Sequence, residues 1–311
     1  MLGAKKFYFI ILVLLTAGIL ISLFGFGGAS GIILEIRLSK VLNALLCGAA
    51  LGTAGVMLQN LLRNPLADPY ILGASSGGTL GIVIAEIAGL AYFSLGFYAF
   101  IIAGAFFASL LVCALAYDKG RSSSVKVILA GIAVNIFLSS LVMLALFIYR
   151  QPYLSVLSFM LGAIGERPVF VLIASAVLII AGFIFALTLA RSADILAFGE
   201  HHAQTLGSDI KKLRYGVLFC AALLVGGSIS LCGAIGFVGF IIPHISRLFV
   251  GPKVKNLITA SALCGAAFLV NMEVINRFIF YPRQVPIGIL CALAGAPFFI
   301  WVLLKNKGEY F

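Results

Sequence analysis

Long apolar stretches alternate with short polar links along almost the whole chain. About ten of these stretches approach the length that a helix needs to cross the hydrocarbon core of a bilayer. None shows the two-residue alternation of a lipid-facing barrel strand, so we predict helices. The eighth stretch is the weakest, because it is short and contains Pro243, His244 and Arg247. The predicted spans are residues 7–28, 41–62, 71–91, 95–117, 125–149, 168–190, 213–232, 235–250, 256–275 and 285–304.

The composition excludes a water-soluble domain. Of 311 residues, 63% are apolar and 10% are charged, whereas soluble domains have about 45–50% apolar and about 25% charged residues. The six cysteines form no C-x-x-C pair, which favours reduced packing residues over a disulfide framework. No phosphate-binding loop, zinc motif or nucleophile elbow occurs. We therefore predict an all-α integral membrane protein, with residues 1–311 forming a single transmembrane domain without catalytic residues, metal or cofactor.

The distribution of basic residues orients the chain in the membrane. The formal net charge is +11, and placing the N-terminus inside puts 15 of the 21 Lys and Arg residues inside and 6 outside. Cytoplasmic segments carry an excess of Lys and Arg, so we expect both termini to be cytoplasmic. The run from Phe7 to Phe24 is long for a signal peptide and no clear cleavage site follows, so we expect this helix to be retained.

The longest polar stretch, residues 191–212, is predicted to lie in the cytoplasm as two short helices. Ser192 or Asp194 would cap the first helix, Gly199 would break it and Gly207 would end the second. Their apolar residues favour docking into the groove of a partner, and packing against the chain's own helix ends is the alternative. These apolar residues are Ile195, Leu196, Phe198, Ala203 and Leu206.

Glycines recur at a spacing of four residues within some of the predicted spans. The spacing of Gly48 and Gly52, repeated in Gly73, Gly77 and Gly81, predicts helices that pack closely. The segment Gln59–Pro69 reads as a tight cytoplasmic corner, because the residue before each of its two prolines is pushed out of the helical region.

Polar side chains in the fifth span are candidates for a translocation path. Asn135 and Ser139 share a face at a spacing of four, and Ser140 follows. Hydrogen bonding between helices is the alternative role for these residues. Glu273 precedes Arg277 by four residues, which predicts an ion pair. No chain of acidic residues crosses the bilayer, which counts against a proton-driven carrier but does not exclude a sodium-driven one.

Eight segments have a characteristic sequence and order along the chain. They are Arg37–Lys40, Gly48–Gly52, Gln59–Pro69, Ile71–Gly77, Phe198–Gly207, Gly233–Arg247, Val285–Gly288 and Gly295–Phe299. In these segments the chain resembles the FecCD/BtuC-type permeases of bacterial ABC importers for iron-siderophores, haem and cobalamin. The resemblance covers nearly the whole chain, and it implies a type II ABC importer permease fold in the bacterial cytoplasmic membrane.

The same resemblance implies partners and assigns roles to residues. We expect two cytoplasmic ATPase subunits, a second permease that is identical or paralogous, and an external substrate-binding protein. Docking of the binding protein would involve Arg37, Lys40 and Arg277, although Lys40 replaces the usual arginine and Gln284 a usual glutamate. An iron-siderophore is the first expectation for the cargo, haem or cobalamin the alternative, and a stand-alone secondary carrier or an intramembrane enzyme the rival classes. The implied ATPase contact comprises Ser192, Asp194, Leu196, Phe198, Gly199, Glu200, Ala203, Leu206 and Gly207.

Overall fold

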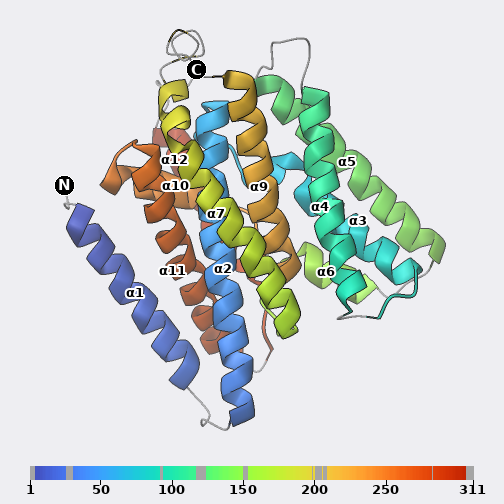
Figure 1. The fold of residues 1–311 in the computed structure, drawn as a ribbon. Helices are drawn as coiled ribbons and strands as arrows, with labels where there is room; N and C mark the ends of the chain where they lie inside the picture. The colour runs from blue at the N-terminus through green and yellow to red at the C-terminus, as the bar shows by residue number, and fades with distance from the viewer. Residues whose placement is uncertain are drawn as a thin grey trace.

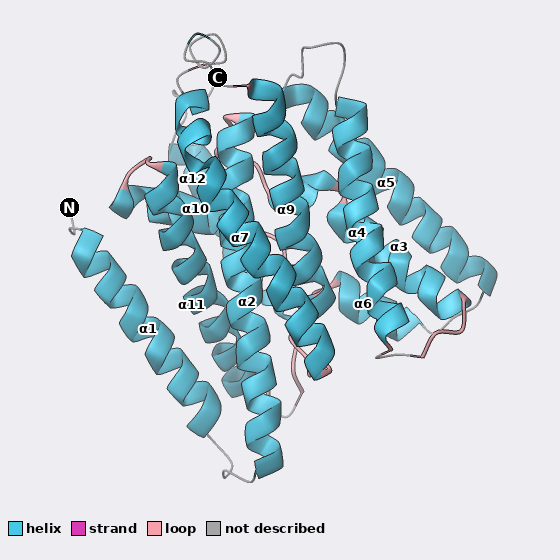
Figure 2. Ribbon diagram, viewed as in Figure 1, coloured by secondary structure: helices cyan, strands magenta, loops and turns pink. Residues whose placement is uncertain are grey.

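The computed structural model describes residues 4–25, 31–91, 94–116, 124–149, 153–197, 199, 205, 209–281 and 283–305. Every regular element in these ranges is a helix (Figure 2). Three apolar helices are short: α3 (Ala74–Ile87), α10 (Val238–Val250) and α12 (Ile287–Lys305). The remaining elements are α6 (Tyr153–Met160) and the 3-10 helix η1 (Pro69–Leu72). Seven helices are long and apolar enough to span a membrane: α1 (Ala4–Phe24), α2 (Gly31–Leu62), α4 (Leu95–Ala116), α5 (Ser124–Tyr149), α7 (Val169–Ala197), α9 (Ile210–Cys232) and α11 (Val254–Phe280).

The seven long and three short apolar helices correspond one to one with the ten predicted stretches, so the all-helical membrane fold is confirmed. The boundaries differ where polar residues continue a helix. α2 already begins at Gly31, before the predicted residue 41, because Arg37 and Lys40 lie within the helix rather than ahead of it. α7 continues through Ala197, so no separate short helix starts at Ser192. The sequence pattern missed α6, which has only eight residues.

α2 and α9 form the centre of the bundle, and the other helices surround them (Figure 1). Within their most apolar windows, 78% of the residues of both helices are buried inside the chain, against 22% for α1 and 28% for α5 and α7. α2 packs against α11, α9, α10 and α7, while α3 packs against α4 and α5. The apolar outer faces of α1, α5 and α7 are therefore left for lipid or for another subunit.

Glycines allow the backbones of several helices to touch, as the spacing predicted. A methyl group at Gly48 in α2 would lie 2.1 Å from the carbonyl oxygen of Gly265 in α11. A methyl group at Gly77 in α3 would lie 2.3 Å from the carbonyl oxygen of Gly104 in α4. Approach this close is possible only without a β-carbon, so these glycines are packing residues.

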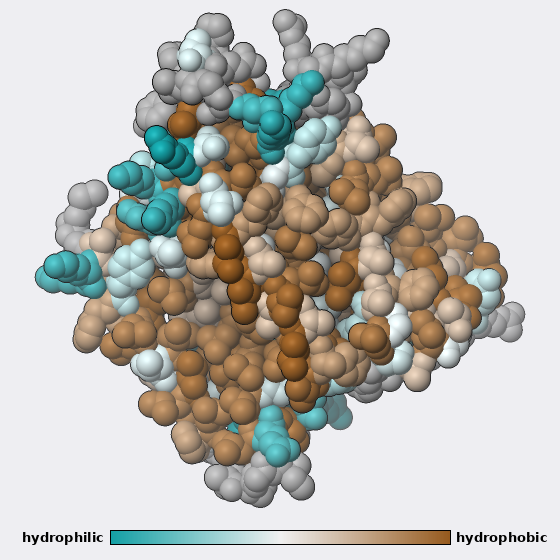
Figure 3. Space-filling model, in the orientation of Figure 1, coloured by the Kyte–Doolittle hydropathy of each residue, from teal (hydrophilic) through white to brown (hydrophobic). Residues whose placement is uncertain are grey.

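Basic residues mark one end of the bundle, here called the basic end, where α2 and α7 finish and α9 and α11 begin. Figure 3 shows a broad hydrophobic face with hydrophilic residues gathered above it at this end. α1 begins toward the basic end, and α12 finishes toward it (Figure 1). This arrangement agrees with an even number of crossings and with the predicted orientation. The described basic residues of this end include Arg63, Arg191, Lys211, Lys212, Arg214, Lys253 and Lys255.

Candidate functional site

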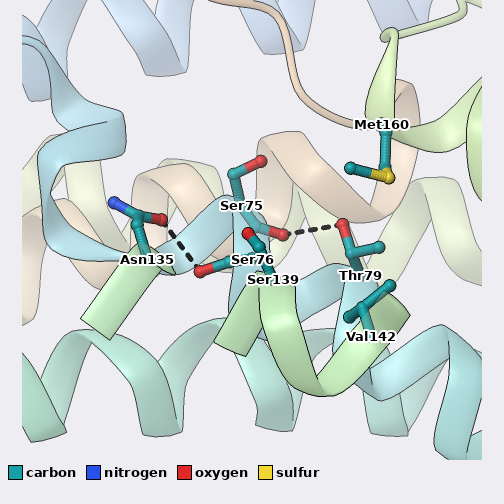
Figure 4. A pocket seen from close by; sticks show the side chains of 7 residues that line it. All are labelled: Ser75, Ser76, Thr79, Asn135, Ser139, Val142 and Met160. Atoms are coloured by element: carbon teal, nitrogen blue, oxygen red, sulfur yellow. Dashed lines mark hydrogen bonds between the residues drawn. The ribbon is translucent and has the colours of Figure 1, made fainter. Parts of the chain in front are cut away.

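A small polar pocket lies between α3 and α5. It has a volume of about 90 Å³, and in Figure 4 the side chains of α3 and α5 converge on it beneath Met160 of α6. Hydroxyl groups and one carboxamide dominate the lining, so the pocket offers neutral hydrogen-bonding groups and no charge. The lining residues are Ser75, Ser76, Thr79, Asn135, Ser139, Val142 and Met160.

Asn135 holds α5 against the segment that leads into α3. The Ser76 hydroxyl lies 2.8 Å from Asn135 Oδ1, and Asn135 Nδ2 donates to the carbonyl oxygen of Tyr70 at 3.1 Å. Both ends of the carboxamide are thus used in hydrogen bonds between elements. This geometry matches the alternative role for Asn135, and it also fixes the orientation of the pocket wall.

A larger hollow of about 530 Å³ lies on the outer face of α5, next to the pocket. All three path residues expected from the sequence line it: Asn135, Ser139 and Ser140. The Ser140 hydroxyl donates to the carbonyl oxygen of Ile136 in its own helix at 2.8 Å. The wall is consequently mostly apolar with a few neutral polar groups.

The start of α3 is held in place by the loop before α10. The backbone N–H of Ile235 donates to Tyr70 Oη at 2.8 Å, and Asp68 Oδ1 accepts from the backbone N–H of Tyr70 at 2.8 Å. Gln59 is 2% exposed, and its Nε2 donates to the carbonyl oxygen of Phe240 at 3.1 Å. The predicted corner is therefore not a bare turn, because it joins α2, η1 and α10 within the protein.

The three predicted docking residues gather around the end of α1, opposite the basic end. Arg277 donates to the carbonyl oxygen of Ser22 at 2.6 Å and pairs with Glu273 at 2.5 Å, which confirms the predicted ion pair. Arg37 is 9% exposed and donates to the carbonyl oxygen of Leu23 at 2.8 Å. Both guanidinium groups therefore hold the chain's own backbone.

Lys40 and Gln284 contact each other at this same end. Lys40 Nζ donates to Gln284 Oε1 at 2.9 Å, so a point charge here meets a neutral amide. Because Gln284 is exposed, this pair remains accessible to a partner from outside.

At the end of α7, Leu196 fits the alternative prediction, in which the apolar residues pack against the chain's own helix ends. Leu196 is only 2% exposed, and its carbonyl oxygen accepts from Arg63 Nη2 at 2.9 Å. Asp194 Oδ1 accepts from the backbone N–H of Val254 at 2.8 Å, so it caps α11 rather than a helix of its own. Gly199, at φ 118°, follows the end of α7 as expected of a helix breaker. The predicted residues Phe198, Glu200, Ala203, Leu206 and Gly207 lie outside the described residues.

α9 begins with a capped turn at the basic end. Asp209 Oδ1 accepts from the backbone N–H of Lys212 at 3.1 Å. This hydrogen bond, together with the nearby Lys212 ammonium, lowers the pKa of the Asp209 carboxyl below its ordinary value. Asp209 therefore stays charged at neutral pH and favours the helix start through the helix dipole.

A sequence profile of the FecCD transport family matches residues 6–305. The chain belongs to the FecCD transport family. The Uncharacterized ABC transporter permease protein YvrB of Bacillus subtilis is 35% identical over 294 residues, which are 91% of this chain and 83% of that protein. The Hemin transport system permease protein HmuU of Yersinia pestis is 33% identical over 282 residues, 89% of this chain and 84% of that protein. A solved structure of a transporter classed as metal-chelate type, in an inward-facing conformation, has a TM-score of 0.87 and 31% identity and covers 97% of this chain and 100% of its own.

Membership of the FecCD family makes this chain a multi-pass permease of the bacterial cytoplasmic membrane and the membrane subunit of an ABC importer. It is not itself an enzyme, because such permeases leave ATP hydrolysis to a partner. A working importer therefore includes an ATPase and a second permease.

Sequence reasoning missed the α3 side of this FecCD permease's polar pocket. Ser75, Ser76 and Thr79 lie in a glycine-rich segment that predicts only close packing. The available signal was their spacing, because Ser75 and Thr79 stand one helical turn apart and face α5 together. The role of Tyr70 in joining α3 to the loop before α10 had no signal in the sequence, because its partner is a backbone N–H 165 residues away.

Proposed function

We propose that this chain is the permease of an importer for a bulky metal chelate, with an iron-siderophore as the first expectation. The proposal is supported mainly by the hollow on α5, which is wide, mostly apolar and edged by neutral polar groups. Relatives named for hemin, vitamin B12 and Fe(3+)-citrate import share about a third of their residues with this chain. The three compounds in these names are metal complexes larger than a bare ion, so haem and cobalamin remain the alternative cargoes.

In this proposal the hollow is half of a path that a second permease completes. The α5 face around the hollow is uncovered in one chain, with Ile136 62% and Met143 55% exposed. Among the described residues no group of three or more His, Cys, Asp or Glu side chains gathers to hold a metal. The path would thus pass a chelate as a whole and would not strip its metal, because weak neutral contacts allow release.

Partners act at the two ends of the bundle. Two ATPase copies would contact the region 191–212, where Ser192 is half-buried at the end of α7. Leu196 would support this contact without touching the ATPase, because its side chain is buried within the permease. An external binding protein would meet the opposite end, where Lys40 and Gln284 are accessible, and Arg37 and Arg277 would shape that surface. All of these sites belong to one domain spanning residues 1–311.

The test is a bulky substitution in the hollow, compared with one on the other side of the same helix. Ser139→Phe should reduce ATP-dependent chelate uptake to background in proteoliposomes that contain the whole importer. Ile148→Phe is the control, because Ile148 is 61% exposed on α5, points to the opposite side of the helix two and a half turns from Ser139, and does not line the hollow. Full uptake by the Ser139 variant would refute the path, and wild-type uptake without the ATPase would refute the importer mechanism. The ligand that co-purifies with the binding protein identifies the cargo.

A further inference from the structure

A second groove lies between α4 and α9, away from the α3 and α5 site. It has a volume of about 360 Å³ and is lined mostly by apolar side chains. Its rim is open to the surroundings of the bundle, since Leu110 is 48%, Tyr215 47% and Phe219 44% exposed. The lining residues are Ser109, Leu110, Cys113, Ala114, Tyr215, Leu218, Phe219 and Ala222.

The walls of this α4–α9 groove are held in place and offer little to a polar ligand. Phe219 packs edge-on against Phe106 of α4 and Phe185 of α7, with ring centroids 5.5 and 6.1 Å apart. The Ser109 hydroxyl is already used, because it donates to the carbonyl oxygen of Ala105 at 2.9 Å. A preformed apolar slot on a membrane-facing surface fits a hydrocarbon chain.

The groove opens toward the basic end, where positive charge stands directly above it. Lys211 precedes Tyr215 by four residues, and Arg214 precedes Leu218 by four, so both cations share the groove face of α9. Lys212 precedes Tyr215 by three residues, so it also stands near this face, and it pairs with Asp209 at 3.6 Å. Figure 3 shows hydrophilic residues gathered over the start of α9, above the hydrophobic band. A tyrosine at this level is typical of the membrane interface.

We propose that the α4–α9 groove binds an anionic phospholipid. One acyl chain lies along Phe219 and Ala222, and the headgroup phosphate lies between Lys211, Arg214 and the Tyr215 hydroxyl. Charge complementarity selects this occupant, because basic pockets between membrane helices bind anionic headgroups. The site lies apart from the α5 hollow, so it stands independently of the cargo proposed above.

Native mass spectrometry of the full chain tests the site with phosphatidylglycerol and phosphatidylcholine of identical acyl chains. Wild-type protein should retain phosphatidylglycerol preferentially. Lys211→Ala and Arg214→Ala should each weaken retention about fivefold. Lys255→Ala removes the same charge at the start of α11, a helix that does not line the groove, and should leave retention unchanged. Equal losses from all three variants, or equal retention of the two lipids, would overturn the proposal.

A second variant separates the groove from the charges. Ala114→Phe fills the apolar slot and leaves every cation in place, so it should also lower phosphatidylglycerol retention; unchanged retention would contradict a chain in the groove. In the assembled importer, a photoreactive residue at Leu110 should form a lipid adduct. An adduct with the ATPase or with the second permease would show that protein covers the groove and would overturn the proposal.

Discussion

The contact between α2 and α11 gives a sharp prediction about Gly48. A methyl group at this position would lie 2.1 Å from the carbonyl oxygen of Gly265 and 2.4 Å from its carbonyl carbon. The approach is reciprocal, since a methyl group at Gly265 would lie 2.2 Å from the carbonyl oxygen of Gly48. Both obstacles are backbone atoms, so no side chain can swing aside and the two helices must separate.

The cost of separating the two helices determines how far Gly48→Ala lowers the free energy of unfolding. Forcing extra atoms into a packed interior costs about 1–3 kcal/mol and occasionally more. Alanine recovers roughly 0.5–1 kcal/mol of this through its better helix propensity. We therefore expect a net loss of about 1–2 kcal/mol, visible as a lower melting temperature of the detergent-solubilised protein.

Gly226→Ala is the matched control, because it makes the same change in the buried helix α9. Apart from the backbone of its own stretch of helix, nothing lies within 4 Å of a methyl group placed there. This variant should gain roughly 0.5–1 kcal/mol from helix propensity alone. The two substitutions should thus shift the melting temperature in opposite directions. Stabilisation by both would refute the close approach of α2 and α11.

Two further substitutions probe buried polar contacts by the same melting measurement. Arg277→Leu leaves the Glu273 carboxylate, 4% exposed, without its cation and should cost about 3–5 kcal/mol. Adding Glu273→Gln should restore most of this loss, and no restoration would refute the ion pair as its cause. Tyr70→Phe removes the acceptor of the Ile235 N–H and should cost about 1–3 kcal/mol. A Tyr70 variant as stable as the wild type would contradict the bond between η1 and the loop before α10.

The spans could be predicted from the sequence because lipid imposes a strict condition. Each crossing needs about 20 apolar residues, and few other structures need such runs. The same criterion misplaced the start of α2, because the charges of Arg37 and Lys40 looked like a polar link ahead of the apolar stretch. In the structure its guanidinium donates to the carbonyl oxygen of Leu23, a partner that an apolar count cannot reveal. Helix ends predicted from hydropathy are therefore wrong where polar residues continue the helix.

The surface predicted at the end of α7 shows a second limit of prediction from the sequence. An apolar side chain in a polar stretch indicates burial, but the pattern does not say whether a partner or the chain itself buries it. Leu196 is buried by its own chain, beside the Arg63 guanidinium that donates to its carbonyl oxygen. That contact joins the end of α2 to the end of α7, and Asp194 joins α7 to the start of α11. In the proposed importer, a force applied by a partner near residue 199 would therefore reach three helices through this junction at once, and these buried residues would transmit it without touching the ATPase.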